Sequence, residues 1–136
     1  MDRPFITVEI TIDANIDKIW DAWANPNDIM QWNNLSPDWH TTRVENDLRP
    51  GGRFVYAMGL KDGSFGFDFK GTYDEVITHE RITYTLHDER RAIIEFKTGR
   101  PVSIVESFEP TTNELAEIQR DFCQAVLTSF KNYVES

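Results

Sequence analysis

The residue types that most often perform chemistry are few and widely spaced in this chain. His40, His79 and His87 are isolated from one another, and the chain holds a single cysteine. Zinc ligands usually occur at short fixed spacings, such as His-Glu-x-x-His or paired cysteines, so we expect no metal site. The sequence also lacks the Gly-x-Ser-x-Gly motif of serine hydrolases, the Walker motif of nucleotide-binding proteins and the glycine-rich dinucleotide-binding motif. We therefore expect no cofactor and assign no catalytic residue.

The single cysteine, Cys123, falls within a helical apolar pattern. A thiol nucleophile needs a neighbouring base, whereas cysteine in an apolar setting usually behaves as a small hydrophobic residue. We interpret Cys123 as a packing residue. A lone cysteine also excludes an intrachain disulfide framework.

Glu106 is the remaining polar candidate. In a strand predicted over 102–109 it shares parity with Ile104 and Phe108, so a regular strand would point it toward the apolar side. Burial there would raise its pKa and suit it to act as a general base or a hydrogen-bonding anchor. A bulge would instead turn Glu106 outward and Val105 inward. Both orientations stay open.

Large apolar side chains form the other candidate site. Tyr56, Tyr73 and Tyr84 can offer hydroxyls to a ligand, although buried tyrosine more often packs with its hydroxyl bonded to a protein neighbour. Trp20 and Trp23 have helix-face spacing and are interpreted as core. A hollow interior and a filled one both fit the pattern. The predicted ligand-binding residues are Trp32, Trp39, Phe54, Tyr56, Met58, Phe67, Phe69, Tyr84, Glu106, Phe108, Phe122 and Val126.

The first third of the chain is predicted to form one strand and two helices. Alternating apolar residues indicate a strand over about 4–12, and apolar residues at i, i+3, i+4 and i+7 indicate a helix that opens near 13–15. Asn25-Pro26 starts a second short helix over about 26–33, because asparagine caps well and proline is tolerated at the first helical position.

From Thr41 to Pro110, alternating runs separated by turn residues predict an antiparallel meander. Pro50-Gly51 fits a type II turn and Asp62-Gly63 a tight type I′ hairpin. The predicted strands include the two arms of that hairpin, at 54–58 and 65–69, and then 66–78, 81–87, 92–97 and 102–109.

A long final helix is predicted over about 113–134, opened by a Thr111-x-x-Glu114 capping box with Asn113 as a competing cap. A sheet with one apolar face closed by such a helix is a two-layer α+β arrangement. We expect a curved antiparallel sheet of six or seven strands wrapped around the C-terminal helix, with two short helices after the first strand. The 136 residues fit one domain, 1–136. The apolar stripe of the helix is Leu115, Ile118, Phe122, Val126, Phe130 and Val134.

Charge and hydropathy exclude several partners. The chain carries 14 Lys+Arg against 23 Asp+Glu, a formal charge of -9, which opposes nucleic acid and anionic lipid. No apolar segment approaches the length of a membrane span, and the first residues do not resemble a secretion signal. A cytoplasmic location is expected, and no oligomeric state is predicted.

Four segments, in order along nearly the whole chain, are specific in combination. They are Ile19-Trp20-Asp21-Ala22-Trp23 with Asn25-Pro26 and Trp32; Arg49-Pro50-Gly51-Gly52-Arg53-Phe54; Gly66-Phe67-Asp68-Phe69-Lys70-Gly71-Thr72-Tyr73; and Phe108-Glu109-Pro110 with Gln119-Arg120 and Phe130-Lys131-Asn132-Tyr133-Val134-Glu135. Together they resemble the START-like (SRPBCC) superfamily, and within it the family named for an activator of a heat-shock chaperone's ATPase.

This resemblance implies a helix-grip fold with a cavity between sheet and helix, used across the superfamily for lipids, hormones, polyketides and flavonoid-like molecules. The leading hypothesis is non-enzymatic binding of a small hydrophobic or aromatic molecule. A second is a cyclase- or hydrolase-like enzyme that uses Glu106 or a tyrosine as acid or base on a polyketide-like ligand. A third, which the family name links to stress response, is a chaperone-associated protein-interaction module.

Overall fold

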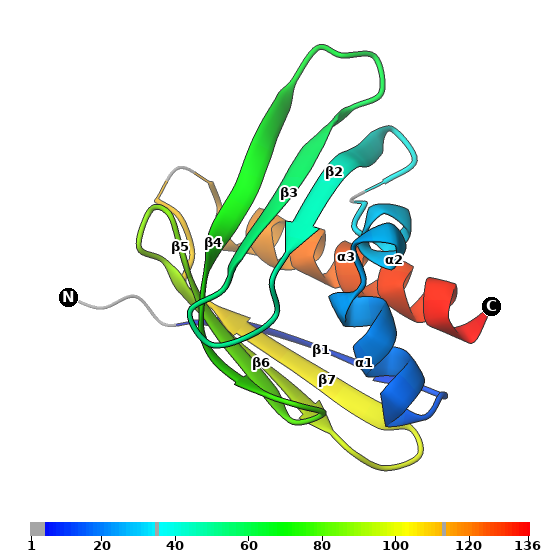
Figure 1. Ribbon diagram of the computed structural model, residues 1–136. Coiled ribbons are helices and arrows are strands. Elements are labelled where there is room, and N and C mark those ends of the chain that lie inside the picture. The colour runs from blue at the N-terminus through cyan, green and yellow to red at the C-terminus, as the bar shows by residue number, and fades with distance from the viewer. Residues whose placement is uncertain (1–4, 35, 113) are drawn as a thin grey trace.

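In the computed structural model, which describes residues 5–34, 36–112 and 114–136, seven strands form one sheet that curls around a long C-terminal helix (Figure 1). This confirms the predicted α+β helix-grip fold, although residue 4 of the predicted first strand lies outside the described residues. In chain order the elements are β1 (Ile6–Ile12), α1 (Ile16–Ala24), α2 (Pro26–Trp32), β2 (Trp39–Asn46), β3 (Arg53–Leu60), β4 (Gly66–Ile77), β5 (Arg81–Leu86), β6 (Arg91–Lys97), β7 (Val102–Phe108) and α3 (Ala116–Glu135).

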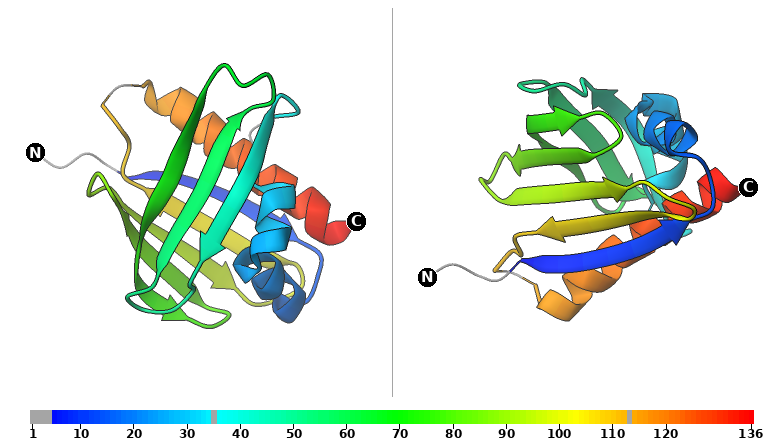
Figure 2. Two further views of the ribbon diagram at one scale, coloured as in Figure 1. Left: turned by 45° about the horizontal axis from the view of Figure 1, so that its top comes forward. Right: turned by 90° about the horizontal axis from the view of Figure 1, so that it is seen from below.

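The sheet is an antiparallel meander whose last strand returns to the first. Its strand order is β1-β7-β6-β5-β4-β3-β2, so every strand after β2 pairs with its predecessor in sequence, and β1 pairs with β7. Register shifts between Thr41 and Arg43 and between Tyr73 and Glu75 interrupt two of the ladders. Such irregularities bend strands. Figure 2 shows the resulting curvature, with α3 running across the concave face and α1 and α2 together at one side.

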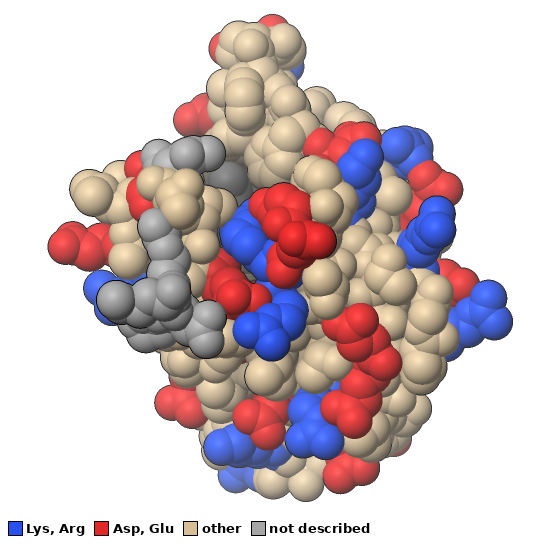
Figure 3. All heavy atoms as spheres, turned by 90° about the vertical axis from the view of Figure 1, so that its left-hand side faces the viewer, with Lys and Arg blue, Asp and Glu red and all other residues tan. Residues whose placement is uncertain are grey.

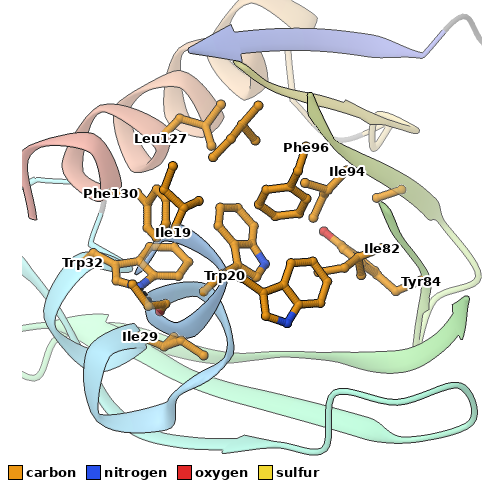
Figure 4. Close-up of a cluster of buried hydrophobic side chains, with 14 of the residues drawn as sticks. Ile19, Trp20, Ile29, Trp32, Ile82, Tyr84, Ile94, Phe96, Leu127 and Phe130 are labelled. Carbon is orange, nitrogen blue, oxygen red and sulfur yellow. Dashed lines mark hydrogen bonds between the residues drawn. The ribbon is translucent and has the colours of Figure 1, made fainter. Parts of the chain in front are cut away.

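One half of the interior is filled by aromatic rings. The Phe130 ring lies 4.8 Å from Trp32 and 5.0 Å from Trp23, measured between ring centroids. The Trp32 indole nitrogen donates to the Ala22 carbonyl at 2.9 Å, so its buried N–H is satisfied. Figure 4 shows Trp32 beside Phe130, and Trp20 beside Phe96. Trp20 and Trp23 are therefore core residues, as the helix-face spacing predicted.

The two halves of α3 behave differently. Leu127, Phe130 and Val134, in the C-terminal half, are buried, whereas Leu115 is 69% exposed and Phe122 is 49% exposed. Of the predicted stripe, Phe130 and Val134 pack in the core, and Phe122 and Val126 face the cavity described below, whereas the N-cap residue Leu115 is exposed and falls outside the helix. The N-terminal end of the stripe is not pressed against the sheet, and it does not complete the filled core.

The capping box predicted for this helix is also wrong. The helix begins at Ala116, and its N-cap Leu115 makes no side-chain capping bond. Gln119 holds the preceding segment instead, because its Nε2 donates to the Glu114 carbonyl at 2.9 Å and its Oε1 accepts from the Thr111 amide at 2.8 Å. The competing cap, Asn113, lies outside the described residues.

The glycine positions correctly predict where the chain turns, but one of the two predicted turn types is wrong. Gly51 has a φ of 83°, as a type II turn after Pro50 requires. Between β3 and β4, Gly63 has a φ of 79° but Asp62 has no positive φ, so the predicted type I′ turn is wrong. The Gly63 amide donates to the Leu60 carbonyl at 2.9 Å, within a longer loop over 61–64.

Candidate ligand cavity

A cavity of about 360 Å³ lies between the sheet and the N-terminal half of α3. Its volume is at the lower end of the range for small-molecule sites. The interior of this fold is thus filled on one side and hollow on the other. The cavity wall includes eleven of the twelve predicted binding residues, namely Trp32, Phe54, Tyr56, Met58, Phe67, Phe69, Tyr84, Glu106, Phe108, Phe122 and Val126. That they bind a ligand stays a prediction.

The twelfth residue, Trp39, does not line the cavity. Its ring lies 6.1 Å from those of Phe65 and Phe67, near the hairpin that joins β3 and β4. Phe67 and Phe122 line the cavity from its rim, because they are 43% and 49% exposed. The deep wall is formed by residues such as Phe54, which is 2% exposed.

Sequence reasoning missed several wall residues. Ile82 and Leu86 have the parity of Tyr84 on β5, and Ala92 and Ile94 face inward from β6, so the same alternation would have found them. The polar residues at the mouth of the cavity follow no such alternation, because separate turns and strand ends bring them together. Three further wall residues are assigned other roles from the sequence, Tyr73 as a possible hydroxyl donor and Trp23 and Cys123 as packing residues. The remaining missed residues are Asn33, Arg90, Arg91, Glu109, Thr111, Glu114 and Gln119.

Glu106 faces the cavity. The β1–β7 register runs without a shift from Ile6↔Phe108 to Ile12↔Val102, so no bulge turns this part of β7 over. Its two cross-strand neighbours, Val8 and Ile94, are both buried. Of the two orientations left open by the sequence, the structure has the inward one.

Burial in this apolar wall raises the pKa of Glu106 to about 7, an effect that a hydrogen bond from the Cys123 thiol partly offsets. Burial also raises the pKa of Tyr84, and the Glu106 carboxylate raises it further. The pKa of Cys123 is raised by burial and by the same carboxylate. Cys123 therefore remains a thiol, which supports a packing role over a nucleophilic one.

Tyr73 and Tyr56 form a hydrogen-bonded pair at the β3 side of the cavity. The Tyr73 hydroxyl donates to the Asn46 side-chain oxygen and is also hydrogen-bonded to Tyr56. Burial raises the pKa of Tyr56. Both hydroxyls thus stay protonated near neutral pH, where they can act as hydrogen-bonding groups.

The rim of the cavity carries charges of both signs. The Arg91 side chain donates to Glu109 Oε1 at 2.7 Å and the Arg91 amide donates to the same oxygen at 2.9 Å, which lowers the pKa of Glu109. Arg90 pairs with Asp88 at 2.8 Å. Figure 3 views this side of the molecule and shows acidic and basic side chains gathered next to one another. Because both arginines have carboxylate partners, the rim is not an anion site.

Other site types find little support. The described residues contain no group of three or more His, Cys, Asp or Glu placed to hold a metal ion. Within the same residues, no helix is both long enough and apolar enough to cross a membrane.

Comparison with known proteins gives a consistent result. Residues 13–135 match the family described as Activator of Hsp90 ATPase homolog 1-like protein. The solution NMR structure of an AHSA1-like protein from Aeromonas hydrophila is similar, with 38% identity over 96% of this chain and 92% of that one and a TM-score of 0.90.

Two further structures extend the comparison. A solution structure of a Cytophaga hutchinsonii protein shares 47% identity over 96% of this chain and 92% of that one, with a TM-score of 0.84. A crystal structure of a Chromobacterium violaceum protein, 18% identical over 98% of this chain and 99% of that one, has a TM-score of 0.87 and shows the shared fold. No curated protein gives a significant match.

Proposed function

This chain belongs to the family of Activator of Hsp90 ATPase homolog 1-like proteins, and from that premise we propose that it is a non-enzymatic binding protein for a small hydrophobic or aromatic molecule. The observation that carries the proposal is the cavity itself, about 360 Å³ in volume, with an apolar wall and a few convergent polar groups. Protein interiors are normally close-packed, so a hollow of this size beside a filled aromatic core supports a ligand site.

Native mass spectrometry of protein purified from its source tests this proposal. We expect an added mass that is retained under native conditions and lost on denaturation. Trp23 and Trp32 line the cavity, so intrinsic fluorescence should also change when flavonoid-like and polyketide-like compounds are titrated into ligand-free protein. A protein that carries no added mass and whose fluorescence responds to no compound in the panel would contradict the proposal.

One observation favours a cyclase- or hydrolase-like enzyme as the second candidate. Glu106 faces the cavity and its pKa of about 7 is close to the optimum for a general base at neutral pH. An enzyme would convert the retained molecule into a product of different mass or absorbance, and Glu106→Gln would stop the conversion. Binding without conversion favours the first candidate.

The chaperone-associated module has no structural observation of this kind in its favour. A fully packed interior would have supported it, whereas the cavity supports a ligand site. The single domain over 1–136, the cytoplasmic location, the link to stress response and the exclusion of nucleic acid all stay predictions.

A further inference from the structure

Resting on the proposed ligand-binding function, we propose that the cavity selects an uncharged aromatic hydroxyl compound whose hydroxyl binds between Glu106 and Tyr84. Glu106 would then be the residue that sets specificity for the polar end of the ligand.

Glu106 has unused hydrogen-bonding capacity. Within residues 5–34, 36–112 and 114–136, the Cys123 thiol is the sole donor to this carboxyl group. A thiol is a weak donor, and an ionised carboxylate can accept about four hydrogen bonds. The side chain lines the cavity, so its remaining acceptor sites are available to a ligand.

Tyr84 presents a hydroxyl group to the same cavity. Its ring is buried at 7% exposure in the cavity wall, and its hydroxyl makes no hydrogen bond to any residue that the structure describes. Among those residues, every fully buried side-chain nitrogen or oxygen has a hydrogen-bond partner. The Tyr84 hydroxyl has none among them, so its oxygen is not fully buried and is accessible from the cavity. Tyr84 on β5 and Glu106 on β7 are two strands apart, about 10 Å between backbones, and are offset by two residues along β6, because Tyr84 pairs with Ala92 and Glu106 with Ile94. Both side chains line the cavity, and the Glu106 carboxylate raises the pKa of Tyr84, so a ligand group in the cavity can approach both.

The strand between them keeps that space open. Ala92 on β6 pairs with Tyr84 on one side and with Phe108 on the other, and its methyl group is the smallest side chain on this part of the wall. A larger residue at this position would extend into the cavity beside the Tyr84 ring. The register therefore leaves a small pocket lined by an acceptor and by a hydroxyl that both donates and accepts.

A hydroxyl group fits this pair better than other polar ends. It can donate to Glu106 and accept from Tyr84 at the same time, whereas an ammonium group only donates and an ether or ketone only accepts. A carboxylate ligand would be repelled by ionised Glu106, and a buried cation would carry a large desolvation cost. Around the pocket, the rings of Phe54 and Phe69 favour an aromatic body, because they offer faces and edges for stacking.

The arrangement predicts how binding depends on pH. The titratable groups that face Glu106 are Tyr84 from β5, Tyr56 from β3 and Cys123 from α3, all of which stay protonated, while β1 and β6 present Val8 and Ile94. Arg90, at the rim, is paired with Asp88. A donating ligand favours ionised Glu106, so its affinity should rise as pH increases through the pKa of about 7. A ligand that only accepts should show the opposite trend.

Three compounds with one aromatic skeleton test the inference by titration calorimetry at pH 5.5 and 8.0: 2-naphthol, 2-methoxynaphthalene and naphthalene. At pH 8.0 we expect 2-naphthol to bind about tenfold more tightly than 2-methoxynaphthalene, because it forms a charge-assisted hydrogen bond. In Glu106→Gln the affinity for 2-naphthol should become independent of pH, and in Tyr84→Phe the preference for the hydroxyl should shrink. Glu9→Gln, on the exposed face of β1, is the matched control and should behave as wild type.

The outcomes separate the two proposals. Equal affinity for all three compounds at both pH values would overturn the selection of a hydroxyl while leaving the cavity as a binding site. A retained pH dependence in Glu106→Gln would equally overturn the role of Glu106. If none of the three compounds binds and the purified protein carries no added mass, the proposed function itself fails. Tyr84→Phe gives an independent reading if Glu106→Gln does not fold.

Discussion

The Cys123 thiol on α3 donates a hydrogen bond to the Glu106 carboxyl on β7, across the end of the cavity that the helix covers. The bond joins the helix to the sheet in a region where the helix has little other burial. It also places the acidic group of the site against a side chain that carries no charge near neutral pH. The pKa of Glu106 is therefore governed mainly by burial, which has a measurable effect on stability.

Glu106→Gln should change how the stability of the protein depends on pH. Because the pKa of Glu106 is raised from 4.5 to about 7 in the folded protein, the native state holds a proton that the unfolded chain releases between these values. Wild type should thus lose stability as pH rises from about 4.5 to 7, by up to about 3 kcal/mol. The variant should lack this loss. Urea unfolding at pH 4.5 and 8 measures it, and an equal difference between the two proteins at both pH values would contradict the burial of this carboxyl.

Phe130→Ala and Phe122→Ala should differ sharply in stability. Phe130 is fully buried between Trp23 and Trp32, so its truncation should cost about 3 to 5 kcal/mol. Phe122 is 49% exposed at the cavity rim, and its truncation should leave the free energy of unfolding within about 1 kcal/mol of wild type. Denaturant unfolding of both variants checks this. Comparable losses would mean that the N-terminal half of α3 packs more tightly than its exposure indicates.

Ala92→Leu should fill part of the cavity and abolish ligand binding with a moderate loss of stability. Ala92 lines the cavity but is only 2% exposed, so part of the added side chain would press on neighbouring residues, and the strain of overpacking should be about 1 to 3 kcal/mol. Ala57→Leu, on a β3 residue that does not line this cavity, serves as the control. Ligand affinity and unfolding should be measured on both. Unchanged affinity in a folded Ala92→Leu protein would place the ligand elsewhere.

Gln119→Ala should loosen the segment before α3 without unfolding the protein. The side chain bonds the Thr111 amide, the Thr111 carbonyl and the Glu114 carbonyl, and the segment is otherwise largely exposed. Local opening of such a segment requires little free energy. We expect faster hydrogen exchange at the Thr111 amide and a nearly unchanged melting temperature. A large drop in melting temperature would show that this segment supports the core.

Chelating agents should leave thermal stability unchanged. The residues that the structure describes offer no cluster of metal-ligating side chains, and the sequence lacks the usual ligand spacings. Melting curves recorded with and without EDTA provide the measurement. A drop of several degrees on chelation would reveal a site that neither the sequence nor the described residues indicate.

Much of the fold was predictable because alternation and helical spacing report which face of an element is apolar. Phe54, Tyr56 and Met58 share parity on β3, and all three face the interior. The orientation of Glu106 was not predictable, because a bulge leaves no mark in a single strand's residue types. The register shifts lie in β2 and β4 instead.

The other differences between prediction and structure depend on how the elements pack against one another, which a sequence pattern does not show. An apolar stripe predicts which side of a helix faces the protein but not how closely each turn approaches it, so Phe122 and Leu127 could not be distinguished. Leu127 meets the core and Phe122 lies over the cavity. Trp39 likewise lies against Phe65 and Phe67, because the pairing of β2 with β3 puts it opposite Leu60 at the end of the hairpin.

The pairing of β1 with β7 has a consequence for synthesis of the chain on the ribosome. Thr7 and Ser107, whose hydroxyls are 2.9 Å apart, are separated by 100 positions, so the first strand to emerge has no partner until nearly the whole sheet has been translated. The hairpins from β2 to β7 close between neighbours and can form earlier. During that interval Val8, Ile10 and Ile12 form an apolar strand with both edges unpaired, the kind of segment that holding chaperones protect from aggregation.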